Sequence, residues 1–261
     1  MRTLPSLLVV GGALVFAALP ALAVDHDNID AGRPLDFDDA ETIAFREKAI
    51  EFGGALAKPK SGKIGVAGDA EFLYGFAKNW QASIGTDPSL ASPNGGSRRF
   101  SFGDVGLGLL HNFNRETERS PAFGFRTDAF LPTGRGSRGT DFRLRAIASK
   151  KFGTYGRLHF NADLGLNQSP GPGGRRTLPG AIVGYSVPLG FPTRFDRTLV
   201  AQVGFRANPQ RGRSGLVNIG IGVRQQVTPR SVFDIGLKGD IAGSGGARES
   251  YRLIAGYSTA F

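Results

Sequence analysis

Apolar and polar residues alternate one by one along most of the chain after residue 45. Between residues 156 and 166, Leu158 and Phe160 alternate with His159 and Asn161. Side chains at positions i and i+2 share one face of a β-strand, whereas a helix repeats every three to four positions. The alternation therefore predicts strands with one apolar and one polar face. About twelve such segments occur, at residues 46–57, 63–74, 79–87, 99–113, 119–131, 140–151, 156–166, 177–187, 196–206, 214–226, 230–241 and 249–261.

The connectors between these segments alternate in length. Short turns at 75–78, 152–155 and 228–229 are separated by longer stretches rich in Gly, Ser, Pro and Arg, such as PTGRGSRGT and QSPGPGGRR. Short turns at one end and longer loops at the other are typical of outer-membrane barrels. Strands of about 9 to 13 residues also suit a tilted crossing of the hydrocarbon layer.

A soluble β-sandwich is the alternative, because its strands alternate in the same way. The polar faces here carry many charges and the apolar faces almost none, which favours lipid on one side and a polar lumen on the other. In lipid, only a closed sheet gives every backbone donor a partner. We therefore predict an all-β fold, a single antiparallel transmembrane β-barrel of about 12 strands over residues 46–261 in the bacterial outer membrane.

The amino-terminal segment indicates export. Residues 1–23 begin with Arg2, continue as an uncharged apolar run and end on the triplet Ala21-Leu22-Ala23. This pattern predicts a cleaved signal peptide of a Gram-negative protein. A membrane anchor is the alternative, but the run contains two prolines and two glycines.

Residues 24–45 form an acidic segment, with seven Asp or Glu residues against Arg33 alone. Such a segment is expected to be either a periplasmic leader or a plug in the lumen. We expect a leader for residues 24–32 and a contact with the lumen or its rim for residues 33–45.

The inward positions of the predicted strands carry charge of two kinds. An acidic wall opposite a basic wall would give the lumen a transverse field; alternatively, the charges pair across a filled interior. The expected acidic wall consists of Glu47, Glu51, Asp69 and Glu71, and the expected basic wall of Arg126, Arg143, Arg145, Lys151, Arg157, Arg206 and Arg224.

The formal net charge of +10 is concentrated in the longer connectors. Export makes nucleic acid an improbable partner, and arginine pairs well with phosphate. The phosphates of lipopolysaccharide are therefore the expected partner of the loops, with plain solvation as the alternative. The expected anion contacts are Arg135, Arg138, Arg175, Arg176, Arg211 and Arg213.

Sequence motifs of catalysis are absent: the chain has no HExxH, no GxSxG and no glycine-rich phosphate loop. His159 shares a face with Asp163 but lacks an obvious nucleophile. We expect no enzymatic activity, no metal site and no cofactor.

The chain ends on Phe261, the last member of an alternating apolar series. We expect this terminal aromatic to lie at the periplasmic interface and to act as the assembly signal read by the barrel-assembly machinery.

The layout from Arg33 onward resembles the outer-membrane transporter family associated with the meta-cleavage pathway of phenol degradation. The resemblance rests on RPLDFDDAETIAFREKAIEFGGALA, FGDVGLGLLHNFNRE and the strand–loop–strand FRTDAFLPTGRGSRGTDFRLRAIASKKFG, with GRLHFNADLGL and the closing strand matching in style. It implies a passive channel that takes up small solutes, aromatic compounds among them. The alternative is a structural or surface-interaction barrel with a closed lumen and loops that bind lipopolysaccharide.

Overall fold

The structure is a computed structural model that describes residues 33–91, 99–190, 196–245 and 247–261. Its strands join in one 14-stranded sheet, and the described residues contain no helix long and apolar enough to cross a membrane. The strands are β1 (Lys48–Pro59), β2 (Gly65–Ala77), β3 (Trp80–Thr86), β4 (Ser89–Ala91), β5 (Arg99–Ser101), β6 (Val105–Asn114), β7 (Ala122–Leu131), β8 (Asp141–Phe152), β9 (Gly156–Leu166), β10 (Thr177–Pro188), β11 (Arg197–Arg206), β12 (Leu216–Thr228), β13 (Ser231–Ala242) and β14 (Glu249–Ala260).

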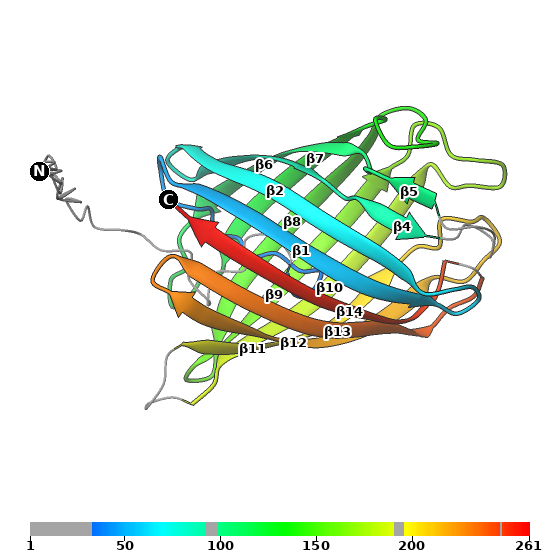
Figure 1. Cartoon of the computed structure of the whole chain (residues 1–261). Coiled ribbons are helices and arrows are strands. Elements are labelled where there is room, and N and C mark those ends of the chain that lie inside the picture. Colours follow the sequence, from blue (N-terminus) through cyan, green and yellow to red (C-terminus); the bar gives the residue numbers. More distant parts are fainter. Residues whose placement is uncertain (1–32, 92–98, 191–195, 246) are drawn as a thin grey trace, which may run out of the picture.

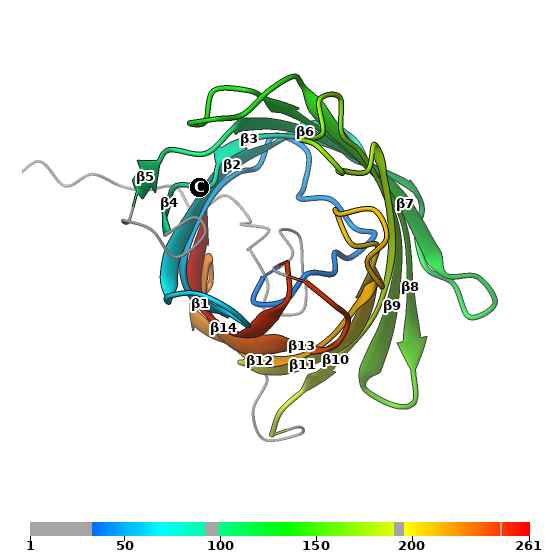
Figure 2. The same cartoon turned by 90° about the vertical axis from the view of Figure 1, so that its right-hand side faces the viewer.

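The sheet closes on itself because β1 pairs with both β2 and β14. Each neighbouring pair in the wall is antiparallel, and Figures 1 and 2 show the resulting barrel from the side and from one end. The wall consists of β1 to β3 and β6 to β14. The predicted fold, a closed antiparallel barrel of about twelve strands, is confirmed.

One predicted segment is slightly shorter in the structure, and another is interrupted. The segment 79–87 ends as β3 at Thr86, because Pro88 follows and its carbonyl accepts a hydrogen bond from Gly68 N at 2.6 Å. The segment 99–113 is split at Gly103, whose φ of 80° suits glycine. The short strands β4 and β5 form a ribbon at the edge of β2, and Figure 1 shows it projecting from the barrel wall.

The outer face of the barrel is a continuous apolar surface. Residues at alternate positions of each strand are substantially exposed, as expected of side chains that face lipid rather than a protein core. On the neighbouring strands β1 and β14, Phe52 and Tyr257 are directly paired, with ring centroids 5.5 Å apart. Other exposed apolar side chains include Phe125, Phe160, Val183, Val203, Ile221, Phe233, Ile235 and Leu253.

The two ends of the barrel differ as the connector lengths predict. One end, here named the turn end, has the connectors 78–79, 115–121, 153–155, 189–196 and 229–230; the other, the loop end, has 60–64, 87–104, 132–140, 167–176, 207–215 and 243–248. The carboxyl terminus lies at the turn end (Figure 1), where Phe261 N donates to Lys48 O at 2.9 Å. The role of Phe261 in assembly remains a prediction, and residues 1–32, with the predicted signal peptide and leader, lie outside the described residues.

Candidate functional site in the barrel lumen

The barrel contains a piece of its own chain. Residues 33–47, here named the inner segment, run through the lumen before β1 begins, as the blue trace in Figure 2 shows. The segment forms no strand, so its backbone needs other partners. Polar side chains of four wall strands supply them: Asp36 N donates to Gln202 Oε1 at 2.7 Å, Asp38 N to Asn161 Oδ1 at 2.7 Å, Ala40 N to Ser149 Oγ at 3.2 Å and Ile43 N to Gln81 Oε1 at 2.9 Å.

Apolar side chains of the inner segment sit in three separate contacts with the wall. Leu35, Phe37, Ala40 and Ile43 are almost fully buried. Burying side chains of the size of Leu and Phe contributes about 1.5 to 3 kcal/mol each. Their partners are inward-facing apolar residues: Ile182 and Val200 around Leu35 and Phe37, then Leu110, Ala122 and Ile147 around Ala40, and Ala49, Leu73, Val232 and Ala260 around Ile43.

Inward-facing glycines make room for the segment. A Cβ added at Gly184 would lie 2.5 Å from a ring carbon of Phe37, and one added at Gly222 would lie 2.5 Å from Pro34 Cγ. Real Cβ atoms do not approach so closely, so a side chain at either position would displace the segment. The wall is therefore shaped to the segment as well as bonded to it.

Ion pairs connect the first part of the segment, from Arg33 to Glu41, to the wall. Buried charges are tolerated where they are paired and hydrogen-bonded. The pairs are Arg33 with Glu51 at 2.8 Å and Asp69 at 2.7 Å, Asp36 with Lys238, Asp38 with Arg145 at 2.7 Å, and Arg157 with Asp39 at 2.9 Å and Glu41 at 2.8 Å.

The two neighbouring carboxyl groups Asp36 and Asp39 respond to burial differently. Burial would raise the pKa of Asp36, but Lys238 and the Gln202 amide outweigh it and hold the pKa at about 2. Burial raises the pKa of Asp39, and the opposing charge of Arg157 does not offset it. Of these two carboxyl groups, Asp36 is therefore the one whose ionised form the site favours.

His159 belongs to this contact surface. Its Nδ1 lies 3.1 Å from Ser149 Oγ and its Nε2 lies 3.0 Å from Ser186 Oγ. The Phe37 ring covers it at a centroid distance of 5.0 Å, and His159 is 0 % exposed. The two serine hydroxyls were not anticipated beside this histidine. With the inner segment in place, the His159 ring is covered and does not reach the open part of the lumen.

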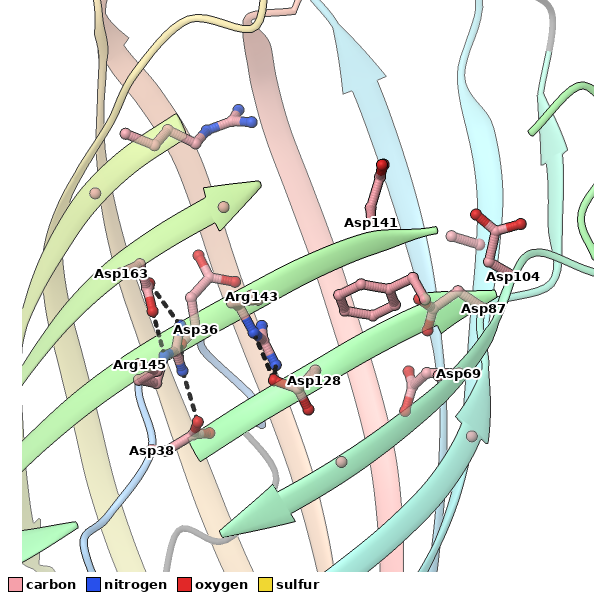
Figure 3. Close-up of a pocket in the computed structure, with 18 of the residues that line it drawn as sticks. Asp36, Asp38, Asp69, Asp87, Asp104, Asp128, Asp141, Arg143, Arg145 and Asp163 are labelled. Carbon is pink, nitrogen blue, oxygen red and sulfur yellow. Dashed lines mark hydrogen bonds and ion pairs between the residues drawn. The ribbon is translucent and has the colours of Figure 1, made fainter. Parts of the chain in front are cut away.

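The lumen is open on the loop side of the inner segment. A cavity of about 950 Å³ lies there, and Figure 3 shows part of its lining. We name this cavity the vestibule. Seven cationic and eleven acidic side chains line it, a formal excess of four negative charges. All seven cations form ion pairs with carboxylates, so the excess negative charge belongs to groups such as Asp87, Asp104 and Asp141.

The expected basic wall does bring its residues to the lumen, but they do not face an acidic wall across it. Arg126 binds Glu71 directly at 2.9 Å, and it also binds its strand neighbour Asp128. The charges named for the two walls are thus paired largely within the wall, and a transverse field across the lumen stays a prediction. The reason is strand register, since Arg143 lies opposite Asp128 and Arg145 opposite Asp163, and each forms an ion pair there.

The other predicted lumen residues are placed as follows. Among the basic residues, Arg157 binds the inner segment and Arg206 binds Asp240 at 3.2 Å. Arg224 is 3 % exposed and lies opposite Asp234 on the neighbouring strand, whereas Lys151 is exposed at the turn end. Among the acidic residues, Glu51 and Asp69 bind Arg33, and Glu47 accepts a hydrogen bond from Ala44 N at 2.8 Å. Arg135 and Arg138 are exposed in connector 132–140, Arg176, Arg211 and Arg213 are exposed in connectors 167–176 and 207–215, and Arg175 is half-buried.

Several contributors were missed at the sequence level, chiefly Gln81, Asn161, Gln202, Lys238 and Asp163. A signal for them was present. Leu110, Ile147, Val200 and Val232 occupy inward positions of otherwise polar faces, which indicates an apolar object inside the lumen.

The closed wall, its apolar outer face and its charged interior define an outer-membrane β-barrel. The chain is similar in fold to solved barrels of that membrane. An outer-membrane channel from Pseudomonas putida F1 matches with a TM-score of 0.65 and 14 % identity, over 85 % of this chain and 98 % of that one. The NanC porin matches with a TM-score of 0.58 and 12 % identity, over 80 % and 98 %. The CymD monoaromatic hydrocarbon channel matches with a TM-score of 0.53 and 10 % identity, over 84 % and 89 %.

No family model and no curated protein sequence matches the chain. The fold predicted from the sequence is confirmed by these structural similarities, and the closed wall with its apolar outer face agrees with the predicted outer-membrane location. The association with phenol degradation remains a prediction.

Proposed function

We propose that the chain is an outer-membrane pore for passive uptake of small solutes, closed at mid-depth by the inner segment. The observation that carries the proposal is the vestibule of about 950 Å³, which ends at a piece of chain whose backbone, from Asp36 to Ile43, is bonded to side chains of the wall. Backbone hydrogen bonds to β2 begin at Arg46 and Glu47, which bond Gly75 next to the start of β1. The inner segment can thus leave the lumen without breaking the backbone hydrogen bonds between the strands of the sheet.

The contacts of the segment support a releasable plug. Between Asp36 and Ile43 its backbone bonds end on side chains, and its carboxylates pair with Arg and Lys side chains of the wall. Release would hydrate these groups again, which offsets much of the loss of their pairing. The barrel wall itself, joined by backbone ladders on every strand, would stay intact.

The class of solute follows from the vestibule. Its excess negative charge would repel small anions and favour cations and uncharged molecules. Uncharged aromatic compounds fit this preference, and they are supported by the resemblance noted in the sequence and by the similarity in fold to a monoaromatic hydrocarbon channel.

A second candidate function is a structural barrel whose lumen never opens. The dense pairing of the inner segment favours it, since Phe37 and Asp39 are both 0 % exposed. In that case the inner segment is a permanent core, and removing it would destabilise the barrel without creating a conducting path.

Single-channel conductance in planar bilayers separates the two candidates. The chain from Val24 onward is compared with a chain lacking residues 24–45, after heat-modifiable migration has shown that both are folded. We expect closed or briefly open channels from the longer chain and steady conductance from the shorter one. A folded shorter chain without conductance would contradict the pore and support the structural barrel.

A further inference from the structure

Three connectors at the loop end are joined into one body. The three-loop body, as we name it, consists of connectors 167–176, 207–215 and 243–248. Arg175 N donates to Pro209 O at 2.8 Å, which ties the first connector to the second. The buried Asn208 side chain donates to Ser244 O at 2.6 Å, which ties the second connector to the third. The three connectors are therefore held in one arrangement.

The three-loop body lies over the mouth of the vestibule. Figure 2 shows its gold and red loops turning inward, within the outline of the barrel. The third connector is bonded to residues that line the vestibule. Arg206 Nη2 donates to Ala247 O at 3.3 Å, and Arg248 Nη2 donates to Asp240 O at 3.0 Å. A solute that enters from the loop end therefore passes the three-loop body before it reaches the vestibule.

The three-loop body is purely cationic. Its connectors contain five arginines and no Asp, Glu, Lys or His. Arg176, Arg211 and Arg213 are exposed, and their side chains form no ion pair with any described residue. Fixed positive charges at a mouth lower the local concentration of cations and raise that of anions. The mouth therefore opposes the entry of cations.

The vestibule beneath the three-loop body has the opposite charge. Its lining has an excess of four negative charges, to which Asp104 and Asp141 belong. Neither carboxylate pairs with a cation of the described residues; Asp104 accepts from Gly134 N at 2.9 Å and Asp141 from Gln168 N at 3.0 Å. Figure 3 shows both lying apart from the ion-paired arginines of the cavity. The vestibule therefore opposes the anions that the mouth admits.

The two layers act on an ion in turn. A cation is repelled at the mouth and an anion in the vestibule, whereas an uncharged solute meets neither barrier. We propose that the exposed arginines of the three-loop body and the unpaired carboxylates of the vestibule form two opposite charge filters in series, which exclude small ions of either sign and admit uncharged solutes. This inference narrows the solute class of the proposed function, and it rests on that function only in taking the vestibule as the path of entry.

The reactivity of a thiol inside the vestibule tests the filter without requiring conduction. The chain contains no cysteine, and the half-buried Ser83 lines the vestibule. Ser83→Cys is introduced into the chain from Val24 onward, and heat-modifiable migration shows that it is folded. The protein is then treated in detergent micelles with small methanethiosulfonate reagents that are neutral, cationic or anionic. Each rate is divided by the rate of the same reagent with a free thiol in the same buffer.

We expect the neutral reagent to react fastest on this scale. Arg211→Ala/Arg213→Ala should raise the rate of the cationic reagent about threefold to fivefold at low salt and leave that of the neutral reagent unchanged. The matched control, Arg115→Ala/Arg119→Ala, removes two exposed arginines from the turn end and should change neither rate.

The second filter is tested with Asp104→Asn/Asp141→Asn, whose amide oxygens can still accept the two backbone hydrogen bonds. This variant should raise the rate of the anionic reagent by a similar factor, about threefold to fivefold. Both effects should fade in about 1 M salt, where the Debye length is about 3 Å.

Four results would overturn the proposal. The cationic reagent could be insensitive to Arg211→Ala/Arg213→Ala or equally sensitive to the control, and the charged reagents could react as fast as the neutral one. A faster neutral reagent in the arginine variant would show that the three-loop body obstructs the mouth by its bulk, and no reaction with any reagent would show a mouth closed to solutes. Because the inner segment stays in place during labelling, a chain that labels as expected but never conducts would contradict the pore alone.

Discussion

The middle of the lumen and its loop-side vestibule are lined by the same twelve strands, yet one is filled and the other is open. In the middle, Arg145 and Arg157 pair with carboxylates of the inner segment. In the vestibule, Arg126, Arg143 and Arg206 pair with carboxylates of the wall itself. The difference teaches that some arginines of the wall find their carboxylate partners on the wall itself, whereas Arg145 and Arg157 also depend on carboxylates that the inner segment supplies.

The largest effect on the filled part of the lumen is expected from removing the main apolar contact of the inner segment. Phe37→Ala should weaken the seating of the segment by about 3 to 5 kcal/mol, the usual cost of deleting a fully buried aromatic side chain. The open probability in planar bilayers should then rise by about a hundredfold or more. Gly184→Ala should act in the same direction, since its methyl group would meet the Phe37 ring.

Phe233→Ala is the matched control for Phe37→Ala, because Phe233 is 43 % exposed on the lipid face. It should leave the open probability unchanged. If Phe37→Ala behaved like this control, the apolar contacts would not hold the lumen closed.

Arg143 and Arg145, both on β8, allow a sharper comparison between the open vestibule and the filled middle of the lumen. Arg145→Gln leaves Asp38, which is 2 % exposed, without its cation. Removing one partner of a buried pair costs about 3 to 5 kcal/mol, part of which would appear as release of the inner segment. Arg143→Gln breaks only a pair within the wall and should leave closure unchanged.

Recordings of both variants under one salt gradient test this contrast. We expect raised open probability for Arg145→Gln alone. In the chain lacking residues 24–45, Arg143→Gln should shift the reversal potential toward cation selectivity, because it removes a positive charge from the vestibule lining. Equal closure phenotypes for the two variants would contradict the division into levels.

The smallest expected effect is a pH dependence of closure through Asp36. Burial opposes the ionised form, but Lys238 and Gln202 hold the pKa of Asp36 at about 2, below its ordinary value of 3.8. Because the pKa of Asp36 is lower when the segment is seated than when it is released, ionised Asp36 stabilises the seated segment above about pH 4. This stabilisation is lost as the pH falls toward 2. Closure should be constant from neutral pH to about pH 5 and weaken below that.

Lys238→Met isolates the contribution of Asp36, since the raised pKa of Asp39 acts in the opposite sense. The pore of this variant should be closed for a smaller fraction of the time at neutral pH, and its closure should no longer weaken when the pH is lowered below about 5. An unaltered acid response in Lys238→Met would show that another group is responsible.

The sequence was sufficient for the barrel because period-two alternation reports directly which side chains share a face. It predicted the strand positions and the inward orientation of Arg143, Arg145 and Arg157. It did not predict their partners, because pairing depends on register between strands and on a segment with no periodicity of its own. Asp163 faces Arg145 only once β8 and β9 are aligned. The inward apolar residues Ile147 and Val200 were the available evidence for a filled lumen.

The central claim, a releasable plug, is tested most directly by tying the inner segment to the wall. An ideal Cβ at Gly124 would lie 3.4 Å from Ala40 Cβ, close to the usual separation across a disulfide, about 3.5 to 4.5 Å. The chain contains no cysteine, so Ala40→Cys/Gly124→Cys gives a single reversible bond, with Gly124→Ala as the control for the added methyl group.

Conductance is recorded from the oxidised double variant and again after reductant is added to the same bilayer. The account predicts no openings while the bond is intact, and openings at the frequency of the Gly124→Ala control once it is reduced. Openings that persist in the oxidised protein, or silence in both states, would contradict a plug that closes the pore by entering and leaving the lumen.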